Sequence, residues 1–396
     1  QLRIGNSVQN GAYNNFIDGA VEHIAVWRGG TGLTQAEVTG MSTGAIHPRK
    51  VQPANLMHYL PLIDSLDDEI AGTWTAVNIS TPTYEASGIT YPDVNAKIIN
   101  HTNFDPALRT KAELTNAAAL KVFFAHASTG GYVVGPLGNW PYNGLLALAT
   151  ENARYTCGRA TWDTPAEPVA SWFTSNNGLG DYWYDNPGYA LKISDFIAVL
   201  TASSDALINA VDVAMMKFCY IDAPDASSWN TGYSATTLFN AYKAMMDARQ
   251  VTNPTKKYVW WTMPIEITGS AGRQSYNDMV RTECATYGHW LFDIAAIESH
   301  DDAGVLQVDG SGYEILTASY ANDAWGHPNA AGSLKLARGY WALITSIANS
   351  SEPAPEAQTF GINEKFTVTG NMELYPVWAP GEPKAQRRIP ELTGVG

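Results

Sequence analysis

The chain has 396 residues, a formal net charge of −14 at pH 7, 45% hydrophobic residues and 16% charged residues. This length exceeds one ordinary hydrophobic core, so we expect at least two domains, and the composition excludes a largely disordered protein. The acidic residues are spread along the chain and the one small basic group is Lys384, Arg387 and Arg388, which excludes nucleic acid as an expected partner.

Cysteine usage and apolar runs exclude two further classes. Cys157, Cys219 and Cys284 have no metal-ligand spacing, and three cysteines allow at most one disulfide. No apolar run is long enough to span a membrane. We therefore expect no metal or other cofactor and no insertion into a membrane.

Residues 1–95 contain short runs of alternating apolar and polar residues. The segments 20–27, 56–62 and 74–79 each predict one strand. Regular short strands of this kind indicate an antiparallel sandwich.

The segments 2–5, 16–27 and 33–38 carry a resemblance. In the last of them, Thr34 is expected to cap a helical turn with Glu37 three residues later. Together they resemble the closing portion of a laminin-G-like (concanavalin A-like) jelly roll. The resemblance implies an incomplete sandwich, whose earlier strands are missing, cleaved or supplied elsewhere. Since this family often binds glycans, it also implies a glycan partner.

Residues 96–119 read as a polar connector with one helical piece, 106–118, and the period then changes. From Lys121 onward, strands alternate with amphipathic helices, which predicts a doubly wound parallel α/β sheet over residues 120–350. The expected strands are 121–125, 211–221, 258–263 and 291–296. The expected helices include one with Ile193, Phe196, Ile197 and Leu200 on a shared face, then about 234–248, one from Gln274, and one that follows His327 and runs to about Ala348.

Residues 351–396 form a tail rich in Pro and Gly. Its segment 366–375 predicts one hairpin with a turn at Gly370 and Asn371. The tail has too few contiguous apolar residues for a core of its own. We therefore expect it to pack against another domain or subunit, in a homo-oligomer or a larger assembly.

The stretch from Leu120 to Gly131 ends an apolar run of β-formers in His126, Ala127 and Ser128, followed by glycine. This pattern predicts a buried parallel strand that opens into a tight turn. Open α/β sheets bind ligands at the carboxyl ends of their strands. Ser128 is therefore either a nucleophile at such an end or merely the cap of the next helix.

Several blocks between residues 119 and 349 together resemble an SGNH (GDSL-type) hydrolase of flavodoxin-like fold, in a branch with His-x-Ser at the first block. The most specific of them is 327–332, just before the final helix. The blocks are 124–130, 186–188, 192–196, 212–222, 262–264, 276–277 with Arg281, 292–295 with Glu298, and 323–332.

The resemblance implies a nucleophile, a base and an orienting acid. Ser128 takes the first role, His327 the second and Asp323 the third. The family commonly has two residues between the last Asp and His, whereas this chain has three. Asp301, Asp302 or a backbone carbonyl therefore remain alternative orienting groups.

The resemblance also implies donors for the oxyanion. The Ser128 N–H, at the positive start of a helix, is the first of them. Gly188 supplies the second from its backbone, with Gly178 and Gly180 as equal alternatives.

Two further positions depart from the family pattern. Ala127 replaces the usual Asp of Gly-Asp-Ser, which makes His126 a possible accessory group. No oxyanion-hole asparagine is evident after the third strand, where Lys217 to Asp222 stands. Lys217 and Asp222 are accordingly either accessory site residues or a buried pair that compensates its own charge.

These observations favour a serine esterase of SGNH type that deacylates a glycan outside the cell, at a cell or virion surface. The 13 Trp and 20 Tyr residues agree with a sugar-binding surface, although most such side chains fill cores. The alternative is a catalytically silent structural or adhesion protein that uses its lectin-like and hydrolase-like domains for binding and assembly.

Overall fold

The computed structural model describes most of residues 96–350 and five short pieces before them. The chain divides into two units, Gln1–Ala354 and Pro355–Gly396, and the second unit, with its expected hairpin, lies outside the described residues. The undescribed positions between 96 and 350 are 107–108, 110, 136–141, 164–169, 185, 202–206, 226–231 and 324. The N-terminal pieces are 7–9, 12–14, 24–27, 33–42 and 56–60.

The N-terminal pieces contain two antiparallel strand pairs. The first joins β1 (Ser7–Gln9) to β2 (Ala12–Asn14), and the second joins β3 (Ile24–Trp27) to β4 (Leu56–Leu60). The second pair agrees with the strands predicted at 20–27 and 56–62. The strand predicted at 74–79 lies outside the described residues, so the jelly roll stays a prediction.

The expected capping box at the start of α1 (Gln35–Ser42) is present. The Glu37 N–H donates to Thr34 Oγ1 at 3.2 Å, and the Thr34 N–H donates to the Glu37 carboxylate at 2.6 Å. Two N–H groups that a helix start leaves free are thereby satisfied.

Seven parallel strands form one sheet in the order β5-β11-β10-β9-β6-β8-β7. The chain adds β7 and β8 on one side of β6, then returns to add β9, β10 and β11 on the other side. β6 and β9 therefore flank the point where the strand order reverses, the usual ligand position in open α/β sheets. The strands are β5 (Ile98–Ile99), β6 (Lys121–His126), β7 (Arg159–Asp163), β8 (Gly178–Trp183), β9 (Val213–Met216), β10 (Lys257–Trp261) and β11 (Trp290–Phe292).

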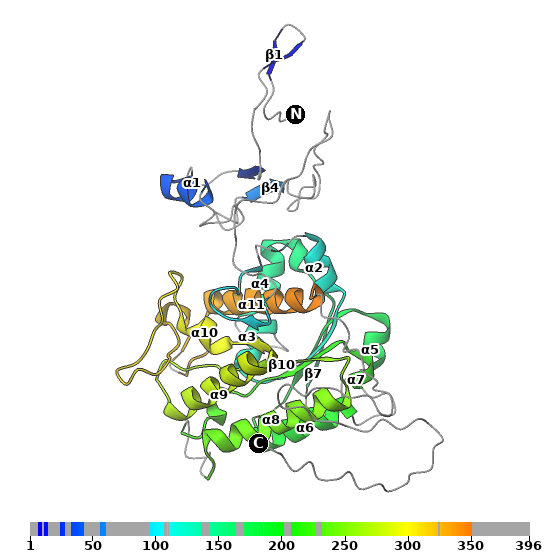
Figure 1. Ribbon diagram of the computed structural model, residues 1–396, viewed down its shortest axis with the longest axis vertical. Coiled ribbons are helices and arrows are strands. Elements are labelled where there is room, and N and C mark those ends of the chain that lie inside the picture. Colours follow the sequence, from blue (N-terminus) through cyan, green and yellow to red (C-terminus); the bar gives the residue numbers. More distant parts are fainter. Residues whose placement is uncertain are drawn as a thin grey trace, which may run out of the picture. The chain divides into compact units, whose positions relative to one another are not determined.

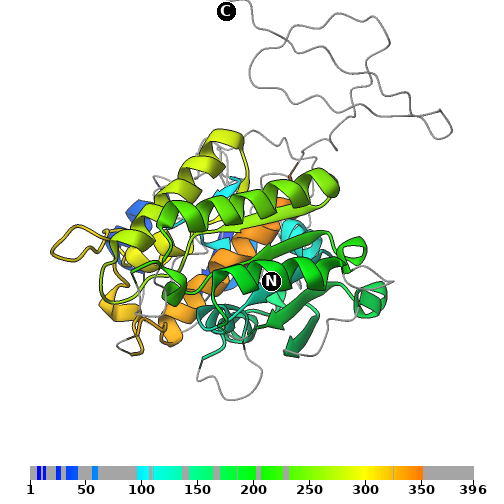
Figure 2. The ribbon, with the colours of Figure 1, turned by 90° about the horizontal axis from the view of Figure 1, so that it is seen from below.

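Helices cover both faces of this sheet, which confirms the expected α/β class (Figures 1 and 2). No helix in the described part of the chain is both long and apolar enough to cross a bilayer. One face carries α5 (Ala170–Ser175), α6 (Tyr189–Thr201), α7 (Leu207–Ala210), α8 (Ala235–Thr252) and α9 (Ala271–Tyr287). The other carries α2 (Lys111–Ala118), α3 (Thr129–Val134), α4 (Gly144–Glu151), α10 (Ile294–Ser299) and α11 (Ala330–Ala348). Short 3₁₀ turns are η4 (Ala153–Tyr155), η5 (Tyr220–Asp222) and η6 (Ala318–Tyr320).

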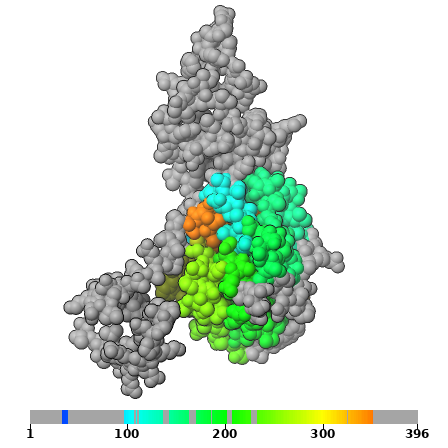
Figure 3. Space-filling model, turned by 90° about the vertical axis from the view of Figure 1, so that its right-hand side faces the viewer, coloured from blue at the N-terminus to red at the C-terminus, as the bar shows by residue number. Residues whose placement is uncertain are grey.

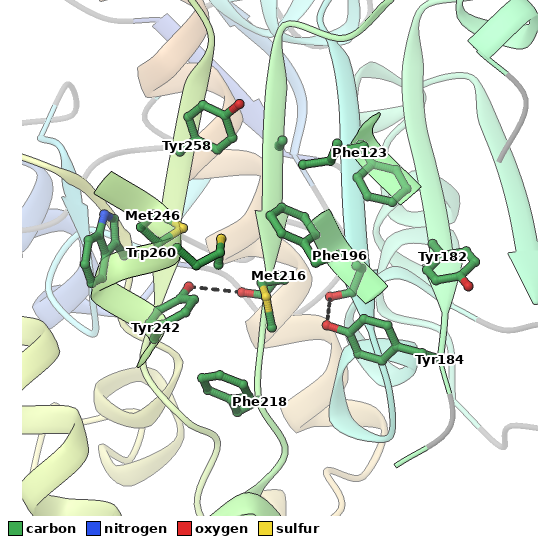
Figure 4. Close-up of a cluster of buried hydrophobic side chains, with 14 of the residues drawn as sticks. Phe123, Tyr182, Tyr184, Phe196, Met216, Phe218, Tyr242, Met246, Tyr258 and Trp260 are labelled. Carbon is green, nitrogen blue, oxygen red and sulfur yellow. Dashed lines mark hydrogen bonds between the residues drawn. The ribbon is translucent and has the colours of Figure 1, made fainter. Parts of the chain in front are cut away.

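Each central strand feeds two cores, because successive side chains point to opposite faces. In β6, Phe123 and Ala125 join one core, while Val122 and Phe124 join the other. Figure 4 shows the first core, where the Tyr184 hydroxyl donates to the Ala125 carbonyl at 3.3 Å. Burial of this kind explains why these strands are apolar along their whole length.

Residues 96–119 are not a free connector in this structure. β5 pairs with β11 at the sheet edge, and α2 packs on α11, where Asn116 donates to Asn349 at 2.8 Å. Figure 3 shows α2 in cyan beside the end of α11 in orange. The α/β layer structure therefore includes residues before 120.

Two of the expected strands are shorter than predicted. The apolar run 211–221 contributes only β9, after which the chain leaves the sheet and turns through η5. The run 291–296 stops at Phe292, because the Asp293 carboxylate accepts the Ala296 N–H at 3.1 Å and begins α10.

Candidate active site

Ser128 lies in a sharp turn between β6 and α3. Its backbone has φ 50° and ψ −118°, and it is the one non-glycine residue with positive φ among those described. A conformation of this kind costs about 1–3 kcal/mol and persists only when the surroundings enforce it. The turn is also tightly packed at Gly130, where an added Cβ would lie 2.5 Å from the Cβ of His126.

The Ser128 hydroxyl does not cap α3. It makes no capping hydrogen bond and lies 2.8 Å from Nε2 of His327, 199 residues later in the chain. The interpretation of Ser128 as merely a helix cap is therefore wrong.

His327 is held from its other side by Asp323. The Nδ1 atom lies 2.8 Å from Asp323 Oδ2, while Oδ1 accepts the N–H groups of Trp325 at 2.9 Å and His327 at 3.2 Å. Burial raises the pKa of Asp323, but the hydrogen bonds from His327 and Trp325 outweigh it and leave this pKa below its usual value. An ionised Asp323 accepts a hydrogen bond from the N–H at Nδ1 of His327. This fixes the tautomer in which Nε2 carries a lone pair directed at Ser128.

The alternative orienting acids lie elsewhere. Asp302 accepts the Tyr320 hydroxyl at 2.5 Å, and Asp301 accepts the N–H groups of Ala303 and Val305, each at 2.9 Å. Neither replaces Asp323. The spacing of three residues between Asp323 and His327 therefore still allows the carboxylate to contact the imidazole.

The start of α11 fixes the loop that carries His327. Asn329 caps this helix by accepting the Gly332 N–H at 3.0 Å, and its own N–H donates to the Tyr320 carbonyl at 2.7 Å. The Asn322 N–H donates to the His327 carbonyl at 2.8 Å. These bonds explain why the sequence of the block 327–332 indicates the position of the histidine: its residues fix the loop and start the helix.

Two tyrosine rings enclose the His327 imidazole. Tyr132, on α3, stacks on it with ring centroids 5.4 Å apart, and Tyr220 meets it edge-on at 5.8 Å. Burial, with the charge of Asp323 as a smaller cause, raises the pKa of Tyr132 to about 12. The sequence patterns assign neither ring to the site. Tyr132 follows a strand end without a polar motif, and Tyr220 lies in the block 212–222 but has no role in its pattern.

The expected oxyanion donors are partly placed. Within the described residues the Ser128 N–H donates to no acceptor, so it is available to a ligand. Gly188 lies in the loop after β8 with φ 92°, in open space, and its role stays a prediction. Gly178 and Gly180 are wrong alternatives. Gly178 begins β8 at the amino ends of the strands, away from Ser128, and its N–H donates to the Leu120 carbonyl at 2.8 Å. Gly180 lies inside the strand.

His126 is buried away from the relay. Its Nε2 atom lies 3.8 Å from Asp181 Oδ1, and the ring packs against Phe124 and Trp183. Burial lowers its pKa, with Asp181 acting in the opposite direction. An accessory role at Ser128 therefore has no support in these contacts.

Lys217 and Asp222 do not form the expected pair. Asp222 instead accepts Lys192 Nζ at 2.5 Å and the Cys219 N–H at 2.7 Å. Lys217 Nζ lies 3.3 Å from the Phe218 carbonyl and 3.6 Å from Cys219 Sγ, and burial lowers its pKa. Both residues thus support the turn after β9 rather than contact Ser128.

One group among the described residues has the composition of a metal site: Asp247, Glu283 and His289. The ammonium of Lys243 already lies 2.8 Å from Asp247 and 2.6 Å from Glu283. The cluster is therefore an ion-pair network between α8 and α9, next to His289, which follows α9.

The fold and the site together define an α/β protein with a serine, histidine and aspartate relay at the carboxyl edge of a parallel sheet. No family model matches the chain, and no curated protein does. Similar solved structures include an acetyl xylan esterase (18% identity, 56% of this chain and 98% of that one, TM-score 0.36). A GDSL-like lipase from Bacteroides thetaiotaomicron VPI-5482 is also similar (13% identity, 60% and 96%, TM-score 0.33). So is a mutant of an acetyl-xylooligosaccharide esterase from Geobacillus (13% identity, 57% and 94%, TM-score 0.33).

Proposed function

We propose that this protein is a serine ester hydrolase. The observation that carries the proposal is the continuous relay from Ser128 Oγ to His327 Nε2 at 2.8 Å, and from His327 Nδ1 to Asp323 Oδ2 at 2.8 Å. A hydroxyl, an imidazole and a carboxylate in this order are what activates a serine for attack on an acyl carbon.

In the acylation step, Ser128 Oγ forms a bond to the acyl carbon and its proton moves to His327 Nε2. The carbonyl π electrons become a lone pair on oxygen, which the Ser128 N–H stabilises. The carbon–oxygen bond to the alcohol then breaks, and the alcohol leaves with the proton from His327. Water repeats the sequence on the acyl-enzyme and releases the acid, which restores Ser128.

Within this proposal the substrate is an acylated glycan. The supporting observation is Trp325, whose side chain is 68% exposed in the loop between Asp323 and His327. The backbone N–H of Trp325 donates to Asp323 Oδ1 at 2.9 Å, while the indole faces solvent. An exposed aromatic face two residues from the base offers a flat apolar surface for a sugar ring. In this proposal the enzyme acts outside the cell, at a cell or virion surface.

A serine-reactive fluorophosphonate probe and a panel of acetylated sugars test the proposal. We expect covalent labelling of Ser128 and release of acetate from at least one sugar ester. Trp325→Ala should raise KM on acetylated sugars and leave 4-nitrophenyl acetate hydrolysis nearly unchanged. Tyr287→Ala, which removes another exposed aromatic ring on α9, is the matched control. No labelling and no hydrolysis by the wild-type protein would favour the silent adhesion or assembly protein instead.

A further inference from the structure

Tyr220 places a hydroxyl group directly at the relay. It follows β9, the strand beside β6 at the point where the sheet order reverses. Its hydroxyl oxygen lies 3.4 Å from His327 Nε2, the same atom that lies 2.8 Å from Ser128 Oγ. The residue is 5% exposed, so its polar end is directed into the site while its ring is buried.

A buried polar network holds Tyr220 in this position. Asp222 closes η5 by accepting the Cys219 N–H, and the Lys192 ammonium neutralises that carboxylate. The Tyr233 hydroxyl donates to the Asp222 carbonyl at 2.7 Å. The network explains why Lys192 can be fully buried, because the carboxylate of Asp222 compensates its charge. The same carboxylate also fixes the turn.

The same turn is also joined to the serine turn. Cys219 Sγ lies 3.5 Å from the carbonyl oxygen of Ala127, the residue before Ser128. The two loops therefore share a direct contact, so the hydroxyl of Tyr220 is preorganised relative to Ser128 rather than recruited by a moving loop.

We propose that the Tyr220 hydroxyl donates a hydrogen bond to the carbonyl oxygen of the ester as negative charge develops on it. Tyr220 would act there together with the Ser128 N–H. It would thus do the work of the side-chain donor that the expected asparagine would have supplied after the third strand. The inference rests on the proposed ester hydrolysis.

The chemistry requires a donor that keeps its proton. Burial raises the pKa of Tyr220 well above its ordinary value, and the nearby Ser128 hydroxyl opposes this shift only in part. The hydroxyl therefore stays neutral at the pH of an esterase assay, and no net proton transfer to or from tyrosine occurs. As the bond from Ser128 Oγ to carbon forms, His327 Nε2 takes the serine proton and is no longer an acceptor, so the Tyr220 O–H turns to the new oxyanion.

The decisive variant is Tyr220→Phe, with Tyr258→Phe as its control. Both lose the hydroxyl of a buried tyrosine, but Tyr258 lies at the amino end of β10, whereas Tyr220 faces the relay. For 4-nitrophenyl acetate we expect Tyr220→Phe to lower kcat about 10²- to 10³-fold with little change in KM, as for loss of one oxyanion donor. Tyr258→Phe should keep kcat within about threefold, because it removes no such donor.

Two further measurements separate this role from its alternatives. A series of aryl acetates with different leaving groups should show the same fold loss throughout. A loss that grows as the leaving group becomes more basic would assign the hydroxyl to the departing alcohol and overturn the proposal. Installing 3-fluorotyrosine at position 220 should restore kcat and add a new loss of activity at high pH, where this more acidic phenol ionises.

Failure of this inference is distinguishable from failure of the proposed function. If the wild-type protein neither hydrolyses esters nor labels, the esterase proposal itself is wrong. If the wild-type protein is active and Tyr220→Phe retains its kcat, the esterase proposal stands and Tyr220 is not a donor to the oxyanion.

Discussion

The ring of Tyr132 lies nearly parallel to the ring of His327, with an interplanar angle of 21°. Tyr132 belongs to the helix that follows the serine, so this helix supports the base as well as the nucleophile. The two members of the relay, 199 residues apart in sequence, thereby share one structural support. A disturbance of α3 should move both of them.

Ser128→Ala and His327→Ala should each reduce hydrolysis of an activated acetyl ester by several orders of magnitude. The Ser128 proton has one base within hydrogen-bond distance of 2.8 Å, and neither variant retains a complete relay. The double variant should be little worse than either single one, because the two side chains act as a unit. Steady-state kinetics checks this, with circular dichroism to show that both variants fold. Independent, multiplying losses would contradict the relay.

Asp323→Asn should be severe, not mild. Asp323 is the acid that contacts Nδ1, and Asp301 and Asp302 are bonded elsewhere. An amide there favours the wrong imidazole tautomer, so kcat should fall about 10²- to 10⁴-fold. Asp302→Asn is the control, and it should retain near wild-type kcat. Comparable activity in both variants would show that another group orients His327.

Ser128→Gly should be inactive yet more stable than Ser128→Ala. Both variants lose the hydroxyl, but glycine adopts the φ of 50° without steric cost, whereas alanine keeps the strain. We expect a difference of about 1 kcal/mol, or about 2–4 °C in Tm for a domain of this size. Differential scanning calorimetry measures it. A glycine variant that melts at or below the alanine variant would refute strain at this turn.

Stability should decline with rising pH because of Glu298, which is buried in α10 and accepts the Ile265 N–H at 2.8 Å. Burial raises its pKa from 4.5 to about 8, against the opposing hydrogen bond from Ile265. Between these two values the folded state binds a proton that the unfolded state has released, so the free energy of unfolding falls as pH rises.

Urea unfolding at several pH values between 4.5 and about 8 measures this decline in the free energy of unfolding. Glu298→Gln should remove most of the decline, because the amide does not titrate and still accepts a hydrogen bond. The exposed Glu151→Gln is the control and should leave the slope unchanged. Equal slopes in wild type and Glu298→Gln would exclude Glu298 as the group responsible.

The central sheet was predictable because burial on both faces makes its strands apolar. β6, β9 and β10 coincide with the runs predicted at 121–125, 211–221 and 258–263, although β9 is shorter. β8 escaped prediction because two of its six residues are glycines. A Cβ on Gly180 would lie 2.4 Å from the Phe173 ring, so packing against α5 demands glycine where strand propensity disfavours it.

At the site, Ser128 and His327 could be predicted although they are 199 residues apart, because each stands in a recognisable sequence pattern. Pairs whose members carry no such pattern could not be predicted. Ser128 follows a recognisable strand, and Asp323 and His327 stand near each other before a helix. Lys192 was not assigned to Asp222, and Tyr220 was not assigned to the relay, because their partners come from other strands and helices. Neither pairing leaves a periodic or spaced signal in the chain.

The buried guanidinium of Arg109 lies 2.5 Å from the Ser346 hydroxyl on α11 and 3.4 Å from the Ala342 carbonyl. A fragment that started at Leu120 would lose the contacts of this buried guanidinium with α11, and it would uncover the backbone edge of β11 that β5 now occupies. The smallest autonomous piece of this chain that carries the relay should therefore begin no later than Ala96. Shorter versions should self-associate through the open edge before their chemistry can be measured.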